Sequence, residues 1–233
     1  MLYGAQGDEM RKSTYLFAKR AFDIIASLLA VMVFMIPWLV IGIIIKIQSP
    51  GPVIYKARRV GINGTPFTLY KFRSMRFDSG AVRITTLRND SRIFPFGKFL
   101  RKSKLDETPQ LLNILKGDMS VIGPRPEDEE NAKALYRDRY TKILDVKPGL
   151  SSPASLFDFT HGEKVDSEEA YKETILPIKL ELELYYVKNR TFSYDIGLVF
   201  KTVVTIIKEI CGMEAALPKE IKQIQDQEKV ESL

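Results

Sequence analysis

A run of 22 residues without a charge, residues 24–45, constrains this chain more than any other feature of its sequence. As a helix the run would be about 33 Å long, enough to cross a hydrocarbon core of about 30 Å. A helix that is apolar on every side is too hydrophobic for the core of a chain of 233 residues. We therefore expect it to lie in a membrane. A cleaved signal peptide is not expected, because the run is too long and no small-residue cleavage site follows it.

Basic residues flank the run on both sides. Four of them lie between positions 11 and 20, and a second basic group begins at Lys46. By the positive-inside rule both flanks are cytoplasmic, which a straight single span cannot satisfy. Pro37 removes one backbone hydrogen bond and bends a helix in the middle of the run. A helix that enters and leaves the membrane by the same face would place both basic flanks on the cytoplasmic side. A spanning helix with a tolerated kink is the alternative.

The net charge of +6 conceals two halves of opposite sign. Residues 1–126 carry 20 basic and 8 acidic side chains, whereas residues 127–233 carry 15 and 21. The basic half predicts an anionic partner. The single cysteine, Cys211, excludes an intrachain disulfide, and the single histidine, His161, argues against a His-rich zinc site or a Ser-His-Asp triad.

Short patterns outline the remaining elements. Asn63-Gly64, between two β-branched and aromatic runs, predicts a hairpin, and a charged loop is expected from Arg76 to about Arg92. The helix expected over residues 195–210 has an apolar face. We expect this face to pack against the protein core; lying in the membrane interface is the alternative. Helices are expected over residues 108–116, 128–145, 177–187 and 195–210, and a frayed charged tail over residues 219–233. That apolar face consists of Ile196, Val199, Phe200, Val203, Ile206, Ile207 and Ile210.

Two adjacent carboxylates, Asp106 and Glu107, form the most suggestive local group, and we call them the dyad. They stand at an expected helix start among the cations Arg101, Lys102 and Lys104. A carboxylate in that setting stays ionised at neutral pH, so it suits a nucleophile or a metal ligand. From local sequence alone, helix capping by Ser103 and Asp106 is the favoured alternative.

Four further cations are candidates for binding phosphate: Lys71, Arg73, Arg101 and Arg125. Lys71 and Arg73 share one face of an expected strand, and Arg125 is held between two prolines. Taken singly, each is better explained as a solvated surface charge. Nucleic acid is not an expected partner, because no helix-turn-helix, zinc-finger or aromatic-ladder pattern accompanies the basic half.

Four motifs together resemble the bacterial sugar transferase family, the small monotopic phosphoglycosyl transferases that act as polyprenyl-phosphate hexose-1-phosphate transferases. They occupy residues 19–23, 70–75, 105–111 and 115–126, the last ending in Gly-Pro-Arg-Pro. The resemblance extends from about residue 19 to residue 210. It implies transfer of a sugar-1-phosphate from a UDP-sugar to polyprenyl (undecaprenyl) phosphate with release of UMP, the first membrane step of capsule, O-antigen, exopolysaccharide or glycoprotein-glycan synthesis.

The resemblance also assigns roles to residues. Asp106 matches the nucleophile, which would form a covalent aspartyl-phosphosugar, and Glu107 matches its partner in the dyad and the candidate ligand of Mg²⁺. Lys71, Arg73, Arg101 and Arg125 match positions that hold phosphates. Pro37 matches the break in a re-entrant membrane helix.

The fold implied is α/β: a compact monotopic membrane-associated fold with a re-entrant helix, a small β element and interfacial amphipathic helices. The expected divisions are a tail (1–18), a membrane helix–break–helix (19–48), a cytoplasmic catalytic domain (49–211) and a second tail (212–233). The implied location is the cytoplasmic face of the bacterial inner membrane, in contact with membrane lipids. The resemblance leaves room for a homodimer and for contacts with downstream glycosyltransferases.

Three positions depart from the family pattern. Ile36 replaces a serine common before the proline, and residues 148–156 lack the usual Trp-Ala-Gln core of that segment. Glu183 stands where relatives often have aspartate, which makes it a further candidate site residue. Two alternatives remain: a non-catalytic membrane-anchored adaptor with the same fold, and a membrane-surface protein that binds nucleic acid or anionic lipid.

Overall fold

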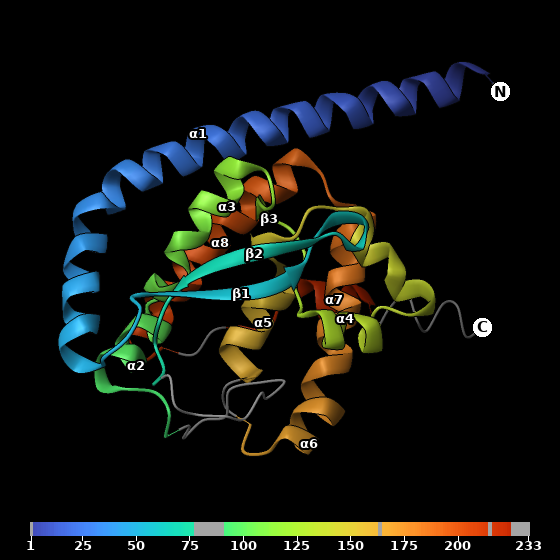
Figure 1. Cartoon of the computed structure of the whole chain (residues 1–233). Coiled ribbons are helices and arrows are strands. Elements are labelled where there is room, and N and C mark those ends of the chain that lie inside the picture. Colours follow the sequence, from blue (N-terminus) through green and yellow to red (C-terminus); the bar gives the residue numbers. More distant parts are fainter. Residues whose placement is uncertain (1, 77–90, 163–164, 214–215, 225–233) are drawn as a thin grey trace.

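The computed structural model describes residues 2–76, 91–162, 165–213 and 216–224, with side chains from residue 13 onward. Over these residues the fold is mixed and mostly helical, with two small sheets and one long N-terminal helix that runs along the rest of the protein (Figure 1). The expected small β element is present, although helices account for more of the fold than an α/β class suggests. The expected loop between Arg76 and Arg92 lies largely outside the described residues.

Helix α1 spans Leu2–Gln48, so the expected tail over residues 1–18 is helical from Leu2 onward. Pro37 lies inside α1, which bends without interruption, so that its last turns run at a steep angle to the first ones (Figure 1). Proline is the usual cause of such a bend. The expected helix–break–helix is therefore a bent continuous helix. Its stretch Ser13–Gln48 is long and apolar enough to cross a membrane, and only 11% of its most apolar window is buried.

The two sheets have two strands each. Strands β1 (Ile54–Val60) and β2 (Pro66–Phe72) are antiparallel, and the turn η1 (Ile62–Gly64) joins them as the sequence predicts. Asn63 takes the left-handed conformation there, with φ of 54°, which asparagine tolerates. Strands β3 (Ser120–Ile122) and β4 (Gly149–Ser151) pair in parallel and join segments that lie far apart in the chain.

Helices differ from expectation where the backbone turns sharply. The expected helix over residues 177–187 is present as α7. The expected helix over 128–145 is divided, because the backbone of Tyr136 and Arg137 is not helical, and a second, 3₁₀ segment begins at Asp138, whose φ is 49°. The expected helix over 108–116 begins three residues earlier, as a 3₁₀ turn that leads into a short α-helix. The helices after β2 are α2 (Pro95–Lys102), η2 (Leu105–Gln110), α3 (Leu111–Lys116), α4 (Glu129–Leu135), η3 (Asp138–Asp145), α5 (Pro153–His161), α6 (Glu168–Ala170), η5 (Tyr171–Ile175), α7 (Leu176–Asn189) and α8 (Phe192–Ile210).

Helix α8 places its apolar face outward. The expectation that this face packs against the core is wrong, because the buried side chains of α8 are Asp195, Leu198 and Thr205. An apolar helix face that the protein does not cover is typical of a helix lying at a membrane surface. The exposed large apolar residues of α8 are Phe192, Phe200, Val203, Val204, Ile207 and Ile210.

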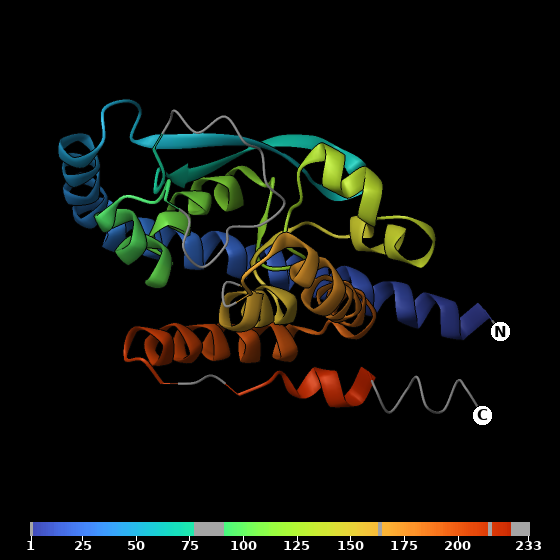
Figure 2. The same cartoon turned by 90° about the horizontal axis from the view of Figure 1, so that it is seen from below.

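The segment after α8 is more ordered than a frayed tail. Residues 219–224 are helical, and Figure 2 shows them beside α8. Glu220 is buried and pairs with Lys201 of α8 at 3.1 Å, while Ile221 and Ile224 pack against the core formed by α5 and α7. The expectation of a charged tail is thus wrong for residues 219–224, and residues 225–233 lie outside the described part.

Polar side chains of α1 fix this long helix to the rest of the protein. Arg20 donates to the carbonyls of Ile114 and Leu115 at the end of α3, at 2.6 and 2.9 Å. Asp23 is buried and accepts from the Ser120 hydroxyl and the Val121 N–H at 3.0 and 2.9 Å.

One turn earlier, the Lys19 ammonium donates to the Ile122 carbonyl at 2.8 Å and pairs with Asp195 of α8 at 2.7 Å. The motif at residues 19–23, which the sequence shows only as a resemblance and a basic flank, is therefore the joint between α1 and the globular part.

Candidate active site

The dyad lies in the turn η2, which begins after a residue in the left-handed conformation. Lys104, with φ of 57°, reverses the chain at the end of α2, and strain of this kind is concentrated at functional sites. Thr108 then closes the turn, because its hydroxyl donates to the Leu105 carbonyl at 2.7 Å. The dyad consists of the two residues between the partners of this bond, so the bond fixes the local backbone of both carboxylates.

The dyad is buried beside two of the expected cations. Asp106 and Glu107 are 1% and 5% exposed. The Lys71 ammonium, at the end of β2, lies 3.0 Å from Asp106 Oδ2 and 3.1 Å from Glu107 Oε1. Arg125 donates to the same Glu107 oxygen at 3.1 Å. The fold thus brings together four of the expected site residues from three distant segments.

The side chain of Asp106 accepts no hydrogen bond from the described residues; its contact with Lys71 is an ion pair only. A buried carboxylate without hydrogen bonds is costly, so its presence points to a functional group. The capping interpretation is wrong, since neither Asp106 nor Ser103 caps the turn: the Ser103 hydroxyl donates to the Phe99 carbonyl of the preceding helix.

Glu107 is the fixed member of the dyad. Burial alone would raise the pKa of its carboxyl, but the positive charges of Arg125, Lys71 and Lys104 outweigh burial and hold that pKa well below its usual value. The facing charge of Glu107 in turn raises the pKa of Arg125. Both groups therefore stay ionised over the whole working range of pH.

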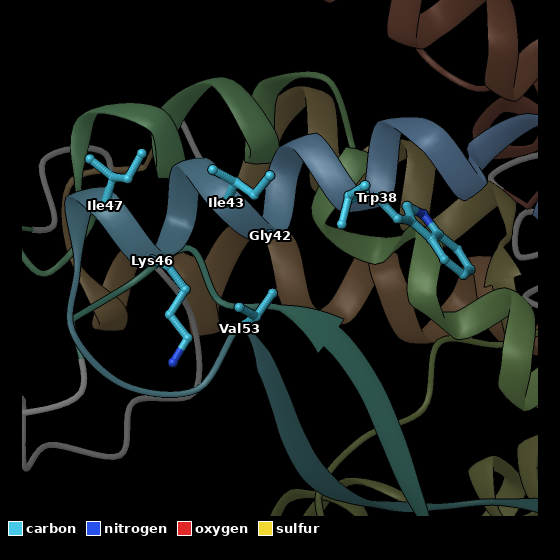
Figure 3. A pocket seen from close by; sticks show the side chains of 7 residues that line it. Trp38, Gly42, Ile43, Lys46, Ile47 and Val53 are labelled. Carbon is cyan, nitrogen blue, oxygen red and sulfur yellow. The ribbon is translucent and has the colours of Figure 1, made fainter.

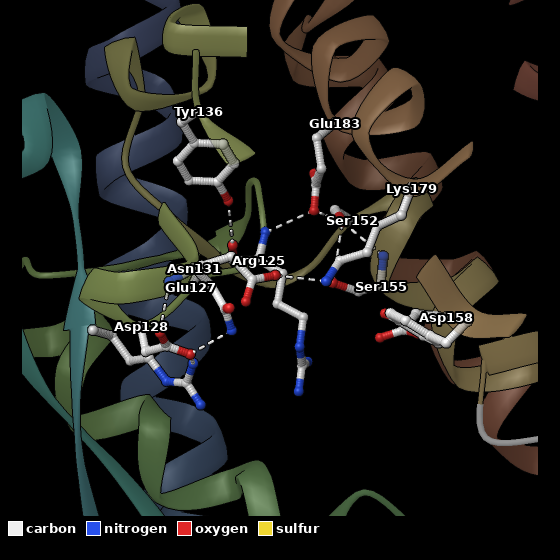
Figure 4. A network of polar contacts seen from close by, with 12 residues as sticks. Arg125, Glu127, Asp128, Asn131, Tyr136, Ser152, Ser155, Asp158, Lys179 and Glu183 are labelled. Carbon is white, nitrogen blue, oxygen red and sulfur yellow. Dashed lines mark hydrogen bonds and ion pairs between the residues drawn. The ribbon is translucent and has the colours of Figure 1, made fainter. Parts of the chain in front are cut away.

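Arg125 is held from behind by Glu183. The Glu183 carboxylate, 1% exposed, accepts the Arg125 backbone N–H at 2.8 Å and the Ser152 hydroxyl at 3.2 Å (Figure 4). Its second oxygen is buried without a hydrogen bond from the described residues. Burial raises the pKa of Glu183 to about 7, against the lowering effects of the Arg125 N–H, Lys179 and Ser152. Glu183 thus supports the site indirectly, because it holds Arg125, which in turn contacts Glu107.

The two remaining expected cations lie elsewhere. Arg73 is 3% exposed and donates to the carbonyls of Ser49 and Pro50, the latter at 2.6 Å. It thereby joins the end of α1 to the end of β2 and is directed at backbone rather than toward the dyad. Arg101 lies in the last turn of α2, partly exposed, and its part in phosphate binding stays a prediction.

Sequence reasoning missed the supports of the site. The buried pair of Lys179 and Glu127, 2.6 Å apart, fixes α7 against the segment that follows Arg125. Ser152 caps α5 and also contacts Glu183. No periodicity or spacing connects residues 52 or 31 positions apart. Only Arg125, held between two prolines, and Glu183, which stands where relatives often have aspartate, pointed to this region.

A metal site made by protein ligands alone is absent from the described part of the chain, where no three His, Cys, Asp or Glu side chains converge. The dyad offers two carboxylates, of which Asp106 has both oxygens without hydrogen bonds. That arrangement suits Mg²⁺, which binds through one or two carboxylates and takes its other ligands from phosphates and water.

Comparison with known proteins gives consistent results. A family model described as "Bacterial sugar transferase" matches residues 14–209. The chain is 37% identical over 206 residues to a UDP-N-acetylgalactosamine-undecaprenyl-phosphate N-acetylgalactosaminephosphotransferase of Aeromonas hydrophila, covering 86% of this chain and 46% of that protein. It is 34% identical over 211 residues to a UDP-glucose:undecaprenyl-phosphate glucose-1-phosphate transferase of Xanthomonas campestris pv. campestris, covering 87% and 41%.

A shorter relative matches almost throughout its length. The exopolysaccharide production protein PSS of Rhizobium leguminosarum bv. phaseoli is 37% identical over 199 residues, which cover 82% of this chain and 95% of that protein. The chain thus spans less than half the length of the two larger relatives and nearly all of the smaller one.

Proposed function

The chain belongs to the bacterial sugar transferase family, and from this we propose that it transfers a sugar-1-phosphate from a UDP-sugar to undecaprenyl phosphate. The observation that carries the proposal is the buried Asp106, free of hydrogen bonds from the described residues and paired with Lys71, beside a Glu107 that is paired with Lys71 and Arg125. The relatives are named for different sugars, so the expected donor is a UDP-hexose without further specification.

We assign the nucleophile to Asp106. One of its oxygens attacks the sugar-side phosphorus of the donor, a new Asp–O–P bond forms, and the P–O bond to the uridine-side phosphate breaks so that UMP leaves. An oxygen of undecaprenyl phosphate then attacks the same phosphorus and breaks the Asp–O–P bond. This returns the carboxylate and gives a lipid-diphosphate-sugar.

Lys71 and Arg125 would hold the phosphates. Both lie at the dyad, and Arg125 offers the planar donor pair that suits phosphate oxygens. Glu107, ionised throughout, keeps the two cations in place. Mg²⁺ with Glu107 as its protein ligand would neutralise the diphosphate when bound.

The membrane arrangement proposed is monotopic, with the dyad on the cytoplasmic face of the inner membrane. It is supported by the bend in α1, by the basic residues on both flanks of the apolar run and by the exposed apolar face of α8. A bent α1 would enter and leave by one face. An acceptor whose phosphate lies at the membrane surface requires an active site at that depth.

The test is UMP release from a panel of UDP-hexoses with Mg²⁺ and undecaprenyl phosphate, comparing wild type with Asp106→Asn. Wild type should release UMP, and the variant should release none above background while still binding donor. Intact-mass measurement after incubation with donor alone should show a wild-type adduct of one phosphosugar. Omission of Mg²⁺ with added chelator should abolish release, and added Mg²⁺ should restore it.

Equal UMP release by Asp106→Asn would refute the covalent route. A folded wild type that releases no UMP from any donor would instead favour the adaptor alternative, in which the fold is kept without chemistry.

A further inference from the structure

Trp38, the only tryptophan of the sequence, directly follows the proline of α1. It lies at one end of an open groove of about 490 Å³ beside the last turns of the helix, and its ring points away from the groove toward the globular part (Figure 3). The groove is otherwise lined by Leu39, Gly42, Ile43, Lys46, Ile47 and Val53. A membrane helix that faces only lipid has no need of an inward indole.

The indole contacts both segments that carry the dyad and its lysine. Its Nε1–H donates to the Thr108 hydroxyl at 2.8 Å. Its ring meets Phe72 edge to face, with centroids 6.3 Å apart and planes at 75°. Phe72 follows Lys71, and Thr108 follows Glu107, so both contacts are one residue away from the site.

The hydrogen bond has a directional effect on the Thr108 hydroxyl. A hydroxyl has one proton to donate and lone pairs to accept with. Because the indole can only donate, the Thr108 proton is left for the Leu105 carbonyl, the bond that spans the dyad. A 3₁₀ turn has poorer backbone hydrogen bonds than an α-helix, so an extra oriented bond matters more there.

We propose that Trp38 is a positioning residue through which the membrane helix fixes the geometry of the dyad, acting through the Thr108 hydroxyl. The inference rests on the proposed transferase function for its kinetic consequence, but its contact can be tested separately. It makes the bent part of α1 a component of the catalytic framework as well as an anchor.

The kinetic test uses Trp38→Phe, which keeps an aromatic ring against Phe72 and removes the N–H, and Thr108→Val, which removes the hydroxyl. Each variant should lower kcat about fivefold, the size expected for one neutral hydrogen bond, with KM for the UDP-sugar within about twofold of wild type. The double variant should lose no more than either single one, because both changes remove the same connection.

Thr141→Val is the matched control. Thr141 makes the same contact in η3, a 2.7 Å bond from its hydroxyl to the carbonyl three residues earlier, far from the dyad in the chain. This variant should keep wild-type kcat. Equal kcat for wild type, Trp38→Phe and Thr108→Val would overturn the proposal, as would losses that simply multiply in the double variant.

Fluorescence supplies a readout independent of activity, because every tryptophan photon comes from Trp38. Thr108→Val should shift the emission maximum relative to wild type, and Thr141→Val should not. A UDP-sugar titrated into Asp106→Asn should change the emission, and the change should be smaller with Thr108→Val added. Absence of both effects would refute the coupling. Absence of UMP release with both effects present would count against the proposed function alone.

Discussion

Glu183 offers a direct test of how burial controls the support of Arg125. The raised pKa of about 7, against an ordinary value of 4.5, means that the folded protein binds a proton at Glu183 that the unfolded chain has lost. The contribution of Glu183 to the free energy of unfolding is fully present below about pH 4.5 and is lost as the pH rises from there to about 7. Replacement by Gln keeps an oxygen for the Arg125 N–H and removes the titration.

The magnitude follows from the size of the shift. A difference of 2.5 pH units at 1.36 kcal/mol per unit corresponds to about 3 kcal/mol of unfolding free energy. The unfolding free energy of Glu183→Gln should therefore rise by about 3 kcal/mol relative to that of wild type as the pH increases from about 4.5 to 7. The variant should remain the more stable protein at higher pH. For a chain of this size the gain corresponds to roughly 6–12 °C in the unfolding midpoint.

The assay is unfolding of both proteins in the same detergent micelles across pH 4.5–8.5. The useful quantity is the difference between variant and wild type at each pH, because other carboxylates titrate equally in both. Glu173→Gln, an exposed carboxyl just before α7, controls for the loss of one negative charge. A difference that stays constant with pH, or that favours wild type at pH 8, would refute the reasoning.

Three other changes test the site and its frame. Gly149→Ala should unfold the β3–β4 pair and abolish activity, because the Cβ of the new alanine would lie 2.0 Å from the Gly123 nitrogen. The measurement is the yield of protein soluble in detergent, and a normal yield would contradict the prediction. Lys71→Met should raise KM for the UDP-sugar about tenfold or more, measured by UMP release, because one cation of the phosphate site is removed. Asp195→Asn should lower the unfolding free energy by about 3–5 kcal/mol, seen as an earlier thermal transition, because Lys19 would lose its buried counter-ion.

The sequence was informative where chemistry is local. The dyad, Lys71 and Arg125 could be identified as motif residues, and the fold brings them together, although Lys71 and Arg125 lie 54 residues apart in the chain. Arg73 shows the limit of strand alternation. β2 ends at Phe72, and the guanidinium of the next residue meets the carbonyls of Ser49 and Pro50 after α1 instead of the dyad.

Helix α8 shows a different limit. Periodicity gave the correct helix, but a hydrophobic stripe indicates only that one face avoids water. In a chain with a membrane helix, that face can be directed outward, and Phe200 and Ile207 are exposed while the polar Asp195 is buried. The division of the helix expected over 128–145 could not be predicted either, because the non-helical backbone of Tyr136 and Arg137 and the positive φ of Asp138 leave little trace in the sequence.

The joint between α1 and the globular part also sets an order of events during synthesis. Lys19 is translated 176 residues before its counter-ion Asp195, and Arg20 is translated 94 residues before the first carbonyl it binds. At about 5–20 residues per second, Lys19 waits roughly 9–35 s for its partner. The partners of Arg20 and Asp23 in α3 and β3, and the Ile122 carbonyl that Lys19 binds, are translated earlier, so Asp195 completes the joint last. A nascent chain that stops short of α8 would leave Lys19 bound to a carbonyl but without its counter-ion.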